Sequence, residues 1–241
     1  MARANASPLE IFEGKRGMSA LMLGECDWDV LTARVDSWRL PRTCLKQYPA
    51  AYIIHSAIDA TLALRHERDL VPERIAEVTV AGFGWLLEDM VHGMGGKSRY
   101  DIDARETADH SLPYCVAVSL VDGEYTLRQL DEPRWTAPDV KAMLAKVRCV
   151  HDPALDGGFP ARRPARITVV TSDGSRCEKQ IDFPKGDPRD PMTDEDIAAK
   201  FRRLSSGVLG ADAQERVIER AFDLRSHTLG ELIDACASRT P

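Results

Sequence analysis

One stretch decides the fold class: Ala-Arg-Ile-Thr-Val-Val-Thr-Ser-Asp-Gly-Ser-Arg-Cys-Glu-Lys-Gln-Ile-Asp-Phe, at residues 165–183. Residues 165–171 are rich in β-branched side chains, which favour strands, and residues 176–183 are expected to form the second strand of a hairpin. The four residues between them, Ser-Asp-Gly-Ser, have the chemistry of a hairpin turn. A fold made of helices alone is therefore excluded.

Strand and helix patterns occupy separate parts of the chain. Two further strands are expected at 75–81, where apolar and polar residues alternate, and at 147–150. Residues 49–64 are apolar almost all round, which is typical of a buried helix. Segregated strands and helices favour an α+β fold with flanking helices. The other expected elements are a glycine-rich loop at 82–96 and helices at about 104–121, 137–147, from Thr193 onward, 211–224 and 228–237.

Composition limits the possible function classes. The chain has 241 residues, of which 44% are hydrophobic, so it can bury a core and is not a disordered protein. It carries 32 Lys and Arg against 38 Asp and Glu, a formal net charge of −6. This balance argues against a nucleic-acid partner, because binding phosphates needs a basic face. The short basic pair Arg202-Arg203 is diluted by acidic neighbours and is interpreted as solvated surface.

Neither a membrane span nor a metal site is expected from the sequence. No stretch approaches the roughly 20 apolar residues of a span, and residues 1–8 lack the apolar core of a signal peptide. The six cysteines are dispersed singly, which predicts reduced thiols and a cytoplasmic location. The six histidines do not pair at the spacing of metal ligands. We therefore expect no metal site built within this chain.

A first polar cluster surrounds the start of the apolar helix, in Lys46-Gln-Tyr48-Pro49 followed by His55 and Asp59. Lys46 lies just before a helix N-terminus, where anions are favoured, so it is a candidate to hold a carboxylate or to act as acid or base. Asp59 is one turn beyond His55 and is expected to orient its imidazole. The alternative is a solvated Lys46 and a core His55.

A second polar cluster, Asp109-His110-Ser111-Leu-Pro113-Tyr114, interrupts the expected helix at 104–121. Proline inside a helix costs about 3 kcal/mol unless it lies in the first turn. With Ser111 as the N-cap, a helix N-terminus would open beside His110 and favour an anion there. A capping serine with a structural histidine is the alternative.

Three ordered signatures together resemble the MmgE/PrpD family, whose members include 2-methylcitrate dehydratase, cis-aconitate decarboxylase and iminodisuccinate epimerase. The resemblance extends from about Glu10 onward and matches only the C-terminal half of a usual member. The matching pieces are Lys46-x-Tyr48-Pro49 with His55 and Ile58-Asp59-Ala60, His110-Ser111-x-Pro113-Tyr114 running to Val121-Asp122-Gly123, and Pro184 to Thr193 with Lys200-Phe201.

The resemblance implies a division of this chain into three parts. Residues 1–70 would be a helical segment of a split helical domain, 71–185 a lid-type α+β domain, and 186–241 C-terminal helices returning to the helical domain. A second chain carrying the family's N-terminal helical domain would complete that domain. The flanking helices here are too few for a bundle of their own.

The resemblance also implies chemistry on a small di- or tricarboxylate, with proton abstraction next to a carboxylate and no metal or other cofactor. The reaction would be a dehydration or a decarboxylation. Ala51 stands where the decarboxylase branch has a histidine, which weakens the decarboxylase assignment. Carried over by position, the implied catalytic residues are Lys46, His55 and His110, and the implied substrate-binding residues are Tyr48, Ser111 and Tyr114.

The leading hypothesis is therefore a small subunit of a split MmgE/PrpD-type lyase, active only with its partner chain. Two alternatives stay open. One keeps the architecture but makes the reaction an epimerisation or isomerisation of a dicarboxylate. The other is a non-catalytic regulatory or scaffold subunit.

Overall fold

The computed structural model describes residue 38 and residues 40–237. The described residues from Arg42 onward belong to one compact unit, and everything below concerns that unit. Of the expected helical segment 1–70, residues 1–37 and 39 lie outside the described residues.

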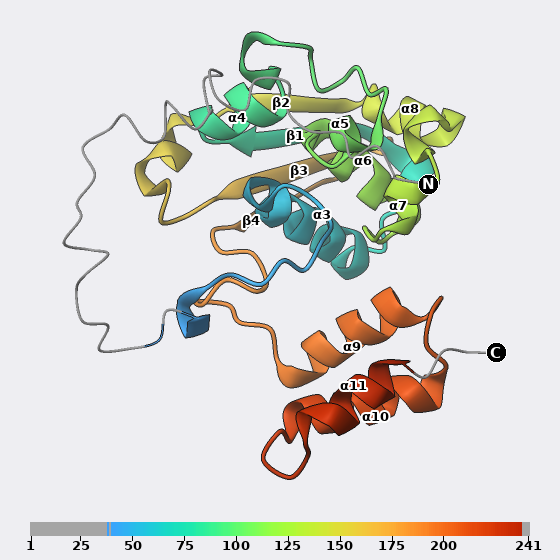
Figure 1. The fold of residues 1–241 in the computed structure, drawn as a ribbon. Helices are drawn as coiled ribbons and strands as arrows, with labels where there is room; N and C mark the ends of the chain where they lie inside the picture. Colours follow the sequence, from blue (N-terminus) through green and yellow to red (C-terminus); the bar gives the residue numbers. More distant parts are fainter. Residues whose placement is uncertain (1–37, 39, 238–241) are drawn as a thin grey trace. The chain divides into compact units, whose positions relative to one another are not determined.

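Four strands form one open mixed sheet in the order β2-β1-β3-β4 (Figure 1). β1 runs parallel to β2 and antiparallel to β3, and β3 runs antiparallel to β4. All four predicted strands are confirmed, and the α+β fold class with them. The strands are β1 (Ile75–Gly82), β2 (Val147–His151), β3 (Ala165–Thr171) and β4 (Arg176–Ile181).

Helices precede, separate and follow the strands. The first six are α3 (His55–Glu67), α4 (Gly84–Met90), α5 (Arg105–Ala108), α6 (Leu112–Asp122), α7 (Arg128–Asp131) and α8 (Pro138–Leu144). The last three are α9 (Asp194–Ser205), α10 (Ala211–Phe222) and α11 (Leu229–Ala237). Short 3-10 turns occur at Leu40–Arg42, Tyr52–Ile54, Pro72–Arg74, Gly93–Gly95, Arg134–Thr136 and Pro153–Gly158.

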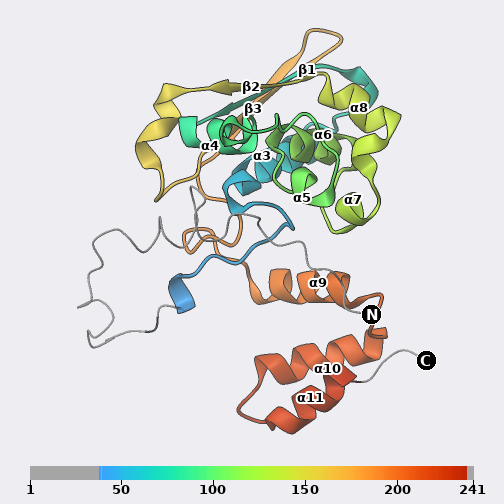
Figure 2. The same cartoon turned by 45° about the horizontal axis from the view of Figure 1, so that its top comes forward.

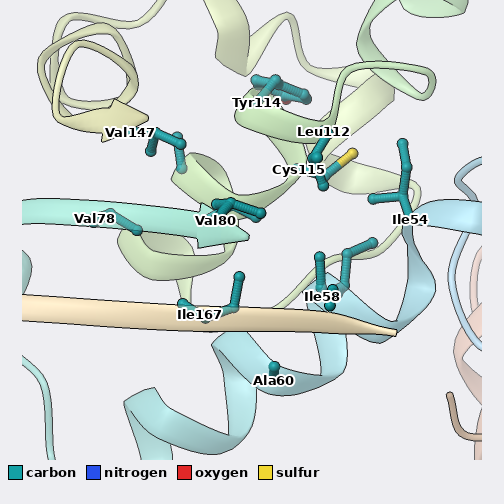
Figure 3. Packing of buried hydrophobic residues seen from close by; sticks show 14 of the residues in the cluster. Ile54, Ile58, Ala60, Val78, Val80, Leu112, Tyr114, Cys115, Val147 and Ile167 are labelled. Atoms are coloured by element: carbon teal, nitrogen blue, oxygen red, sulfur yellow. The ribbon is translucent and has the colours of Figure 1, made fainter. Parts of the chain in front are cut away.

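The main core lies between the sheet and the helices on one of its faces. Figure 2 shows α3, α4 and α6 together on that side. Successive side chains of a strand point to opposite faces, and on β3 the residues Ala165, Ile167 and Val169 are buried. α3 packs on β3 and β4 and also contacts α6. Figure 3 shows Ile58 of α3 beside Ile167, with Cys115 of α6 completing this part of the core. α3 thus shares its core with the sheet.

Two predicted helices have different boundaries in the structure. The helix expected at 49–64 begins at His55, after the 3-10 turn Tyr52–Ile54, and continues to Glu67. The helix expected at 104–121 is two helices, α5 and α6, because residues 109–111 are not helical. Pro113 lies in the first turn of α6, where its missing N–H costs no hydrogen bond.

The prediction of a loop at 82–96 was wrong for residues 84–90. α4 occupies Gly84–Met90, and its side chains Leu86, Leu87 and Met90 are buried. Their spacing is that of one helix face, and the sheet covers that face. Tertiary burial therefore outweighs the low helix propensity of the glycines that flank this segment.

The C-terminal helices follow the predicted pattern. Thr193 and Asp196 form a capping box: the Thr193 hydroxyl accepts from the Asp196 N–H, and the Asp196 carboxylate accepts from the Thr193 N–H. α10 and α11 pack on each other around a small separate cluster that includes Leu209 and Val217. The capping box fixes the N-terminus of α9, the helix that carries part of the candidate site described below.

Candidate functional site

A cavity of about 460 Å³ brings together three segments that are far apart in the sequence. The first is residues 46–49, before α3. The second is residues 125–128, which run from the loop after α6 to the first residue of α7. The third is the last part of α9, with Lys200, Arg203 and Leu204. We call this cavity the cationic pocket, because two lysines and two arginines line it.

Three of its four cations have no carboxylate partner among the described residues. Arg128 is held by Glu124, which accepts hydrogen bonds of 3.1 and 2.7 Å from the guanidinium. Lys46 Nζ instead donates to the Ala50 carbonyl at 3.0 Å. The remaining two cations are Lys200, which donates to the Lys46 carbonyl, and Arg203. Like charges gathered without counter-charges favour an anionic ligand.

The pKa of Lys200 is lowered in this environment. Burial lowers it first, and the neighbouring charges of Arg203 and Lys46 lower it further. A lysine surrounded in this way gives up its proton more readily than one in water. An anion bound between the three side chains would reverse the effect, because it favours the charged form.

Tyr48 forms the aromatic part of the pocket wall. Its hydroxyl donates to Asp59 Oδ1 at 2.6 Å, and its ring lies edge-on to Tyr125. Burial, followed by the Asp59 charge, raises the Tyr48 pKa well above its ordinary value. Tyr48 is therefore a neutral phenol at physiological pH.

His55 is fully buried behind this wall, with its ring packed edge-on against Tyr48. The expectation that Asp59 orients its imidazole was wrong, because Asp59 accepts from Tyr48 and from the Lys185 backbone N–H. His55 Nε2 is 3.4 Å from the Ala50 carbonyl oxygen, and Nδ1 has no hydrogen-bond partner in the described part of the chain. Burial lowers the His55 pKa to about 4. The imidazole is neutral, as in the core alternative.

His110 is outside the lining of the cationic pocket, and its side chain is about half exposed. Its Nδ1 contacts the Asp109 carboxylate, and this hydrogen bond raises the His110 pKa. The two polar clusters are nevertheless neighbours, because the Ala51 N–H donates to the Asp109 carbonyl at 2.9 Å.

Ser111 and Tyr114 have partners inside the protein. Ser111 is the predicted N-cap of α6: its hydroxyl accepts from the Tyr114 N–H and donates to the Arg99 carbonyl at 2.6 Å. The Tyr114 hydroxyl donates to the Gln129 carbonyl at 2.5 Å in the core. Both residues are fully buried and neither lines the cationic pocket, so we leave them out of the proposed site.

Replacing Ser111 therefore tests a structural role against a binding role. Ser111→Ala removes the cap of α6 and leaves the Arg99 carbonyl without this donor, so we expect a loss of about 1–2 kcal/mol in unfolding free energy. Urea unfolding measures this loss. Carboxylate binding by the folded variant should equal that of the wild type, and a clear loss of binding at unchanged stability would return Ser111 to the site.

Sequence reasoning missed the contribution of α9 to the site. The pair Arg202-Arg203 was interpreted as solvated surface, which is correct for Arg202, since it pairs with Glu195 and Glu215. Arg203 is exposed as well, but it also lines the cationic pocket, which the sequence interpretation did not foresee. Helical spacing contained a signal, because Lys200 and Arg203 are three residues apart and thus share a face.

Searches for a metal centre and a membrane span gave no candidates in the described residues. Across that part of the chain, no three His, Cys, Asp or Glu side chains are arranged to hold a metal ion. None of the helices described is long and apolar enough to cross a membrane.

Comparison with known proteins identifies the family. The model of the MmgE/PrpD C-terminal domain matches residues 48–224, and the chain belongs to this family. It is 29% identical over 187 residues to cis-aconitate decarboxylase of Mus musculus, covering 74% of this chain and 36% of the relative. It is 25% identical over 217 residues to the cis-aconitate decarboxylase-like protein oryM of Aspergillus oryzae, covering 82% and 41%.

A third relative has a different reaction in its name. The chain is 27% identical over 150 residues to 2-methylcitrate dehydratase of Cupriavidus necator, covering 59% of this chain and 30% of the relative. The matches therefore span well under half of each of these relatives. The family includes both decarboxylases and dehydratases, so membership alone leaves the reaction open.

Proposed function

We propose that the chain is a subunit of an MmgE/PrpD-type lyase, and that its cationic pocket binds carboxylates of a small di- or tricarboxylate. The observation that carries this proposal is the group of Lys46, Lys200 and Arg203, which have no carboxylate partner among the described residues. Charge-assisted hydrogen bonds from lysine and arginine are the strongest that a carboxylate receives from a protein.

The same cations suit proton abstraction next to a carboxylate. Removing that proton places negative charge on the carboxylate oxygens, and nearby fixed cations stabilise this charge. Lys46 is our candidate acid or base. Lys200 is a second candidate, because its lowered pKa brings it closer to the range in which a lysine exchanges protons at neutral pH. Tyr48, as a neutral phenol, shapes the wall between them and His55.

A second chain carrying a helical domain is part of the proposal. The three cations of this pocket suit one end of a di- or tricarboxylate, and donors from a second chain would bind its remaining carboxylates and strengthen the binding. The known relatives that match are more than twice as long as the matched region, which supports further polypeptide at the site. Large apolar side chains are exposed on the helices α9, α10 and α11 and in the loop between α10 and α11. A partner chain that packed against these helices would bury these side chains. They are Leu204, Phe222, Leu224, Leu229 and Ile233.

The partner proposal predicts the composition of the native complex. Native mass spectrometry of the tagged chain from its own host should find a stable complex with a second chain. In that complex Lys46→Ala should abolish turnover of the carboxylate substrate, and Lys141→Ala, an exposed lysine on α8, should not. Full activity of the pure chain, or of the Lys46→Ala complex, would contradict the proposal.

The same complex decides between reaction outcomes. NMR in deuterated water distinguishes loss of water or carbon dioxide from exchange at the α-carbon alone, which would indicate an epimerase. Normal turnover by the partner in the absence of this chain would instead indicate a regulatory or scaffold subunit.

A further inference from the structure

Asp59 joins the segment that carries Lys46 and Tyr48 to the segment that leads into α9. Its Oδ1 accepts from the Tyr48 hydroxyl at 2.6 Å, and its Oδ2 accepts from the Lys185 backbone N–H at 2.8 Å. Tyr48 belongs to the segment that also carries Lys46. Lys185 belongs to the segment that leads into α9, the helix of Lys200 and Arg203.

The connection continues from Lys185 to the first turn of α9. The Lys185 ammonium lies 3.4 Å from the carboxylate of Asp196, the capping-box residue of that helix. This ion pair connects the Asp59–Lys185 hydrogen bond to the first turn of α9.

A backbone contact beside Asp59 holds the same two segments together. The Leu45 N–H donates to the Gly186 carbonyl at 2.8 Å. Gly186 has φ +92°, and a Cβ at this position would lie 2.0 Å from the Leu45 carbonyl oxygen. Only glycine permits this approach. The two segments therefore meet along a short line of contacts, to which Asp59 contributes side-chain hydrogen bonds, as do Lys200 to the Lys46 carbonyl and Tyr52 to Asp187.

We propose that Asp59 is a positioning residue, which sets the distance between Lys46 and Tyr48 on one side of the cationic pocket and Lys200 and Arg203 on the other. Its importance for carboxylate binding rests on the proposed function, but its effect on the distance does not. Burial raises the Asp59 pKa, so the fold keeps this carboxyl group in place against a desolvation cost.

Chemical cross-linking measures that distance directly in the full-length chain. The Lys200 ammonium donates to the Lys46 carbonyl, so a short amine-reactive cross-linker should join the two side chains, and mass spectrometry quantifies the product. Asp59→Ala removes both hydrogen bonds, and we expect the Lys46–Lys200 product to fall several-fold. Tyr48→Phe breaks only one of the two hydrogen bonds and should cause a smaller loss.

Two control variants separate positioning from general destabilisation. Thr61→Ala, two residues along the same helix, removes a buried hydrogen bond to the Ala57 carbonyl outside the pocket and should leave the product unchanged. Asp59→Asn should restore the product, because the amide can accept from Lys185 and donate to Tyr48. An equal yield in wild type and folded Asp59→Ala, or an equal loss in Thr61→Ala, would overturn the proposal.

A ligand titration separates this proposal from the proposed function. NMR titration with propane-1,2,3-tricarboxylate should show binding by the wild type and by Asp59→Asn and much weaker binding by Asp59→Ala. If the cross-link falls in Asp59→Ala while the wild type does not bind the probe, the proposed function fails and the positioning role stands. If wild type and Asp59→Ala give the same cross-link yield and bind the probe equally well, the positioning role of Asp59 fails and the proposed function stands.

Discussion

Arg203→Glu is expected to weaken the binding of propane-1,2,3-tricarboxylate by roughly 10- to 100-fold, since a charge-assisted hydrogen bond contributes about 1.5–3 kcal/mol. The substitution removes one of three cations and places a negative charge beside Lys46 and Lys200. The Arg203 side chain is exposed and makes no hydrogen bond or ion pair with another described residue, so the fold should tolerate the change. An NMR titration of the full-length chain measures the effect.

Arg216→Glu is the matched control. Arg216 is also an exposed helical arginine, but it lies on α10 and does not line the pocket. It introduces the same change in net charge, so a difference between the two variants reports the position of the charge rather than its amount. Equal weakening in both variants would mean that the probe senses only the overall charge, and the pocket assignment would fail.

Acidification is expected to destabilise the protein through His55. Burial holds the His55 pKa at about 4, below the ordinary value of 6.5. As the pH falls below 6.5, the unfolded chain takes up a proton on this residue that the folded chain does not, so stability is lost as the pH decreases. Between pH 7 and 4.5 this one group should cost about 2–3 kcal/mol of unfolding free energy.

The contribution of His55 is isolated by comparison with His55→Gln. Glutamine keeps an amide donor for the Ala50 carbonyl but does not titrate, so its stability should fall less over the same pH range. Urea unfolding at pH 7 and at pH 4.5 gives the two differences. The same loss in both proteins would contradict a buried neutral His55, because the loss would then come from other groups.

The strands could be predicted from the sequence because their signals are local. The turn at residues 172–175 fixes its own hairpin, and the β-branched residues of 165–171 favour a strand wherever they occur. Helix caps were equally accessible: Thr193 and Ser111 both cap the helices predicted for them. α4 was missed because its helical state depends on burial against a sheet whose strands are distant in the sequence.

The site was only half predictable for the same reason. Lys46 and Tyr48 were found because they precede an apolar helix and belong to a family signature. Arg203 joins them only after the chain folds, and Asp59 faces Tyr48 and Lys185 rather than His55 because of where the segment at 185 lies. Spacing along one helix showed which residues share a face but not which distant segment that face meets.

The central claim is that Lys46, Lys200 and Arg203 form a carboxylate site. The most direct measurement follows the side-chain NMR signals of labelled lysines and arginines while propane-1,2,3-tricarboxylate is added to the full-length chain. We expect the signals of these three residues to shift together and to saturate. Unchanged signals at these three residues, with the largest shifts at Arg68 and Arg74 in a separate cavity, would contradict the carboxylate site.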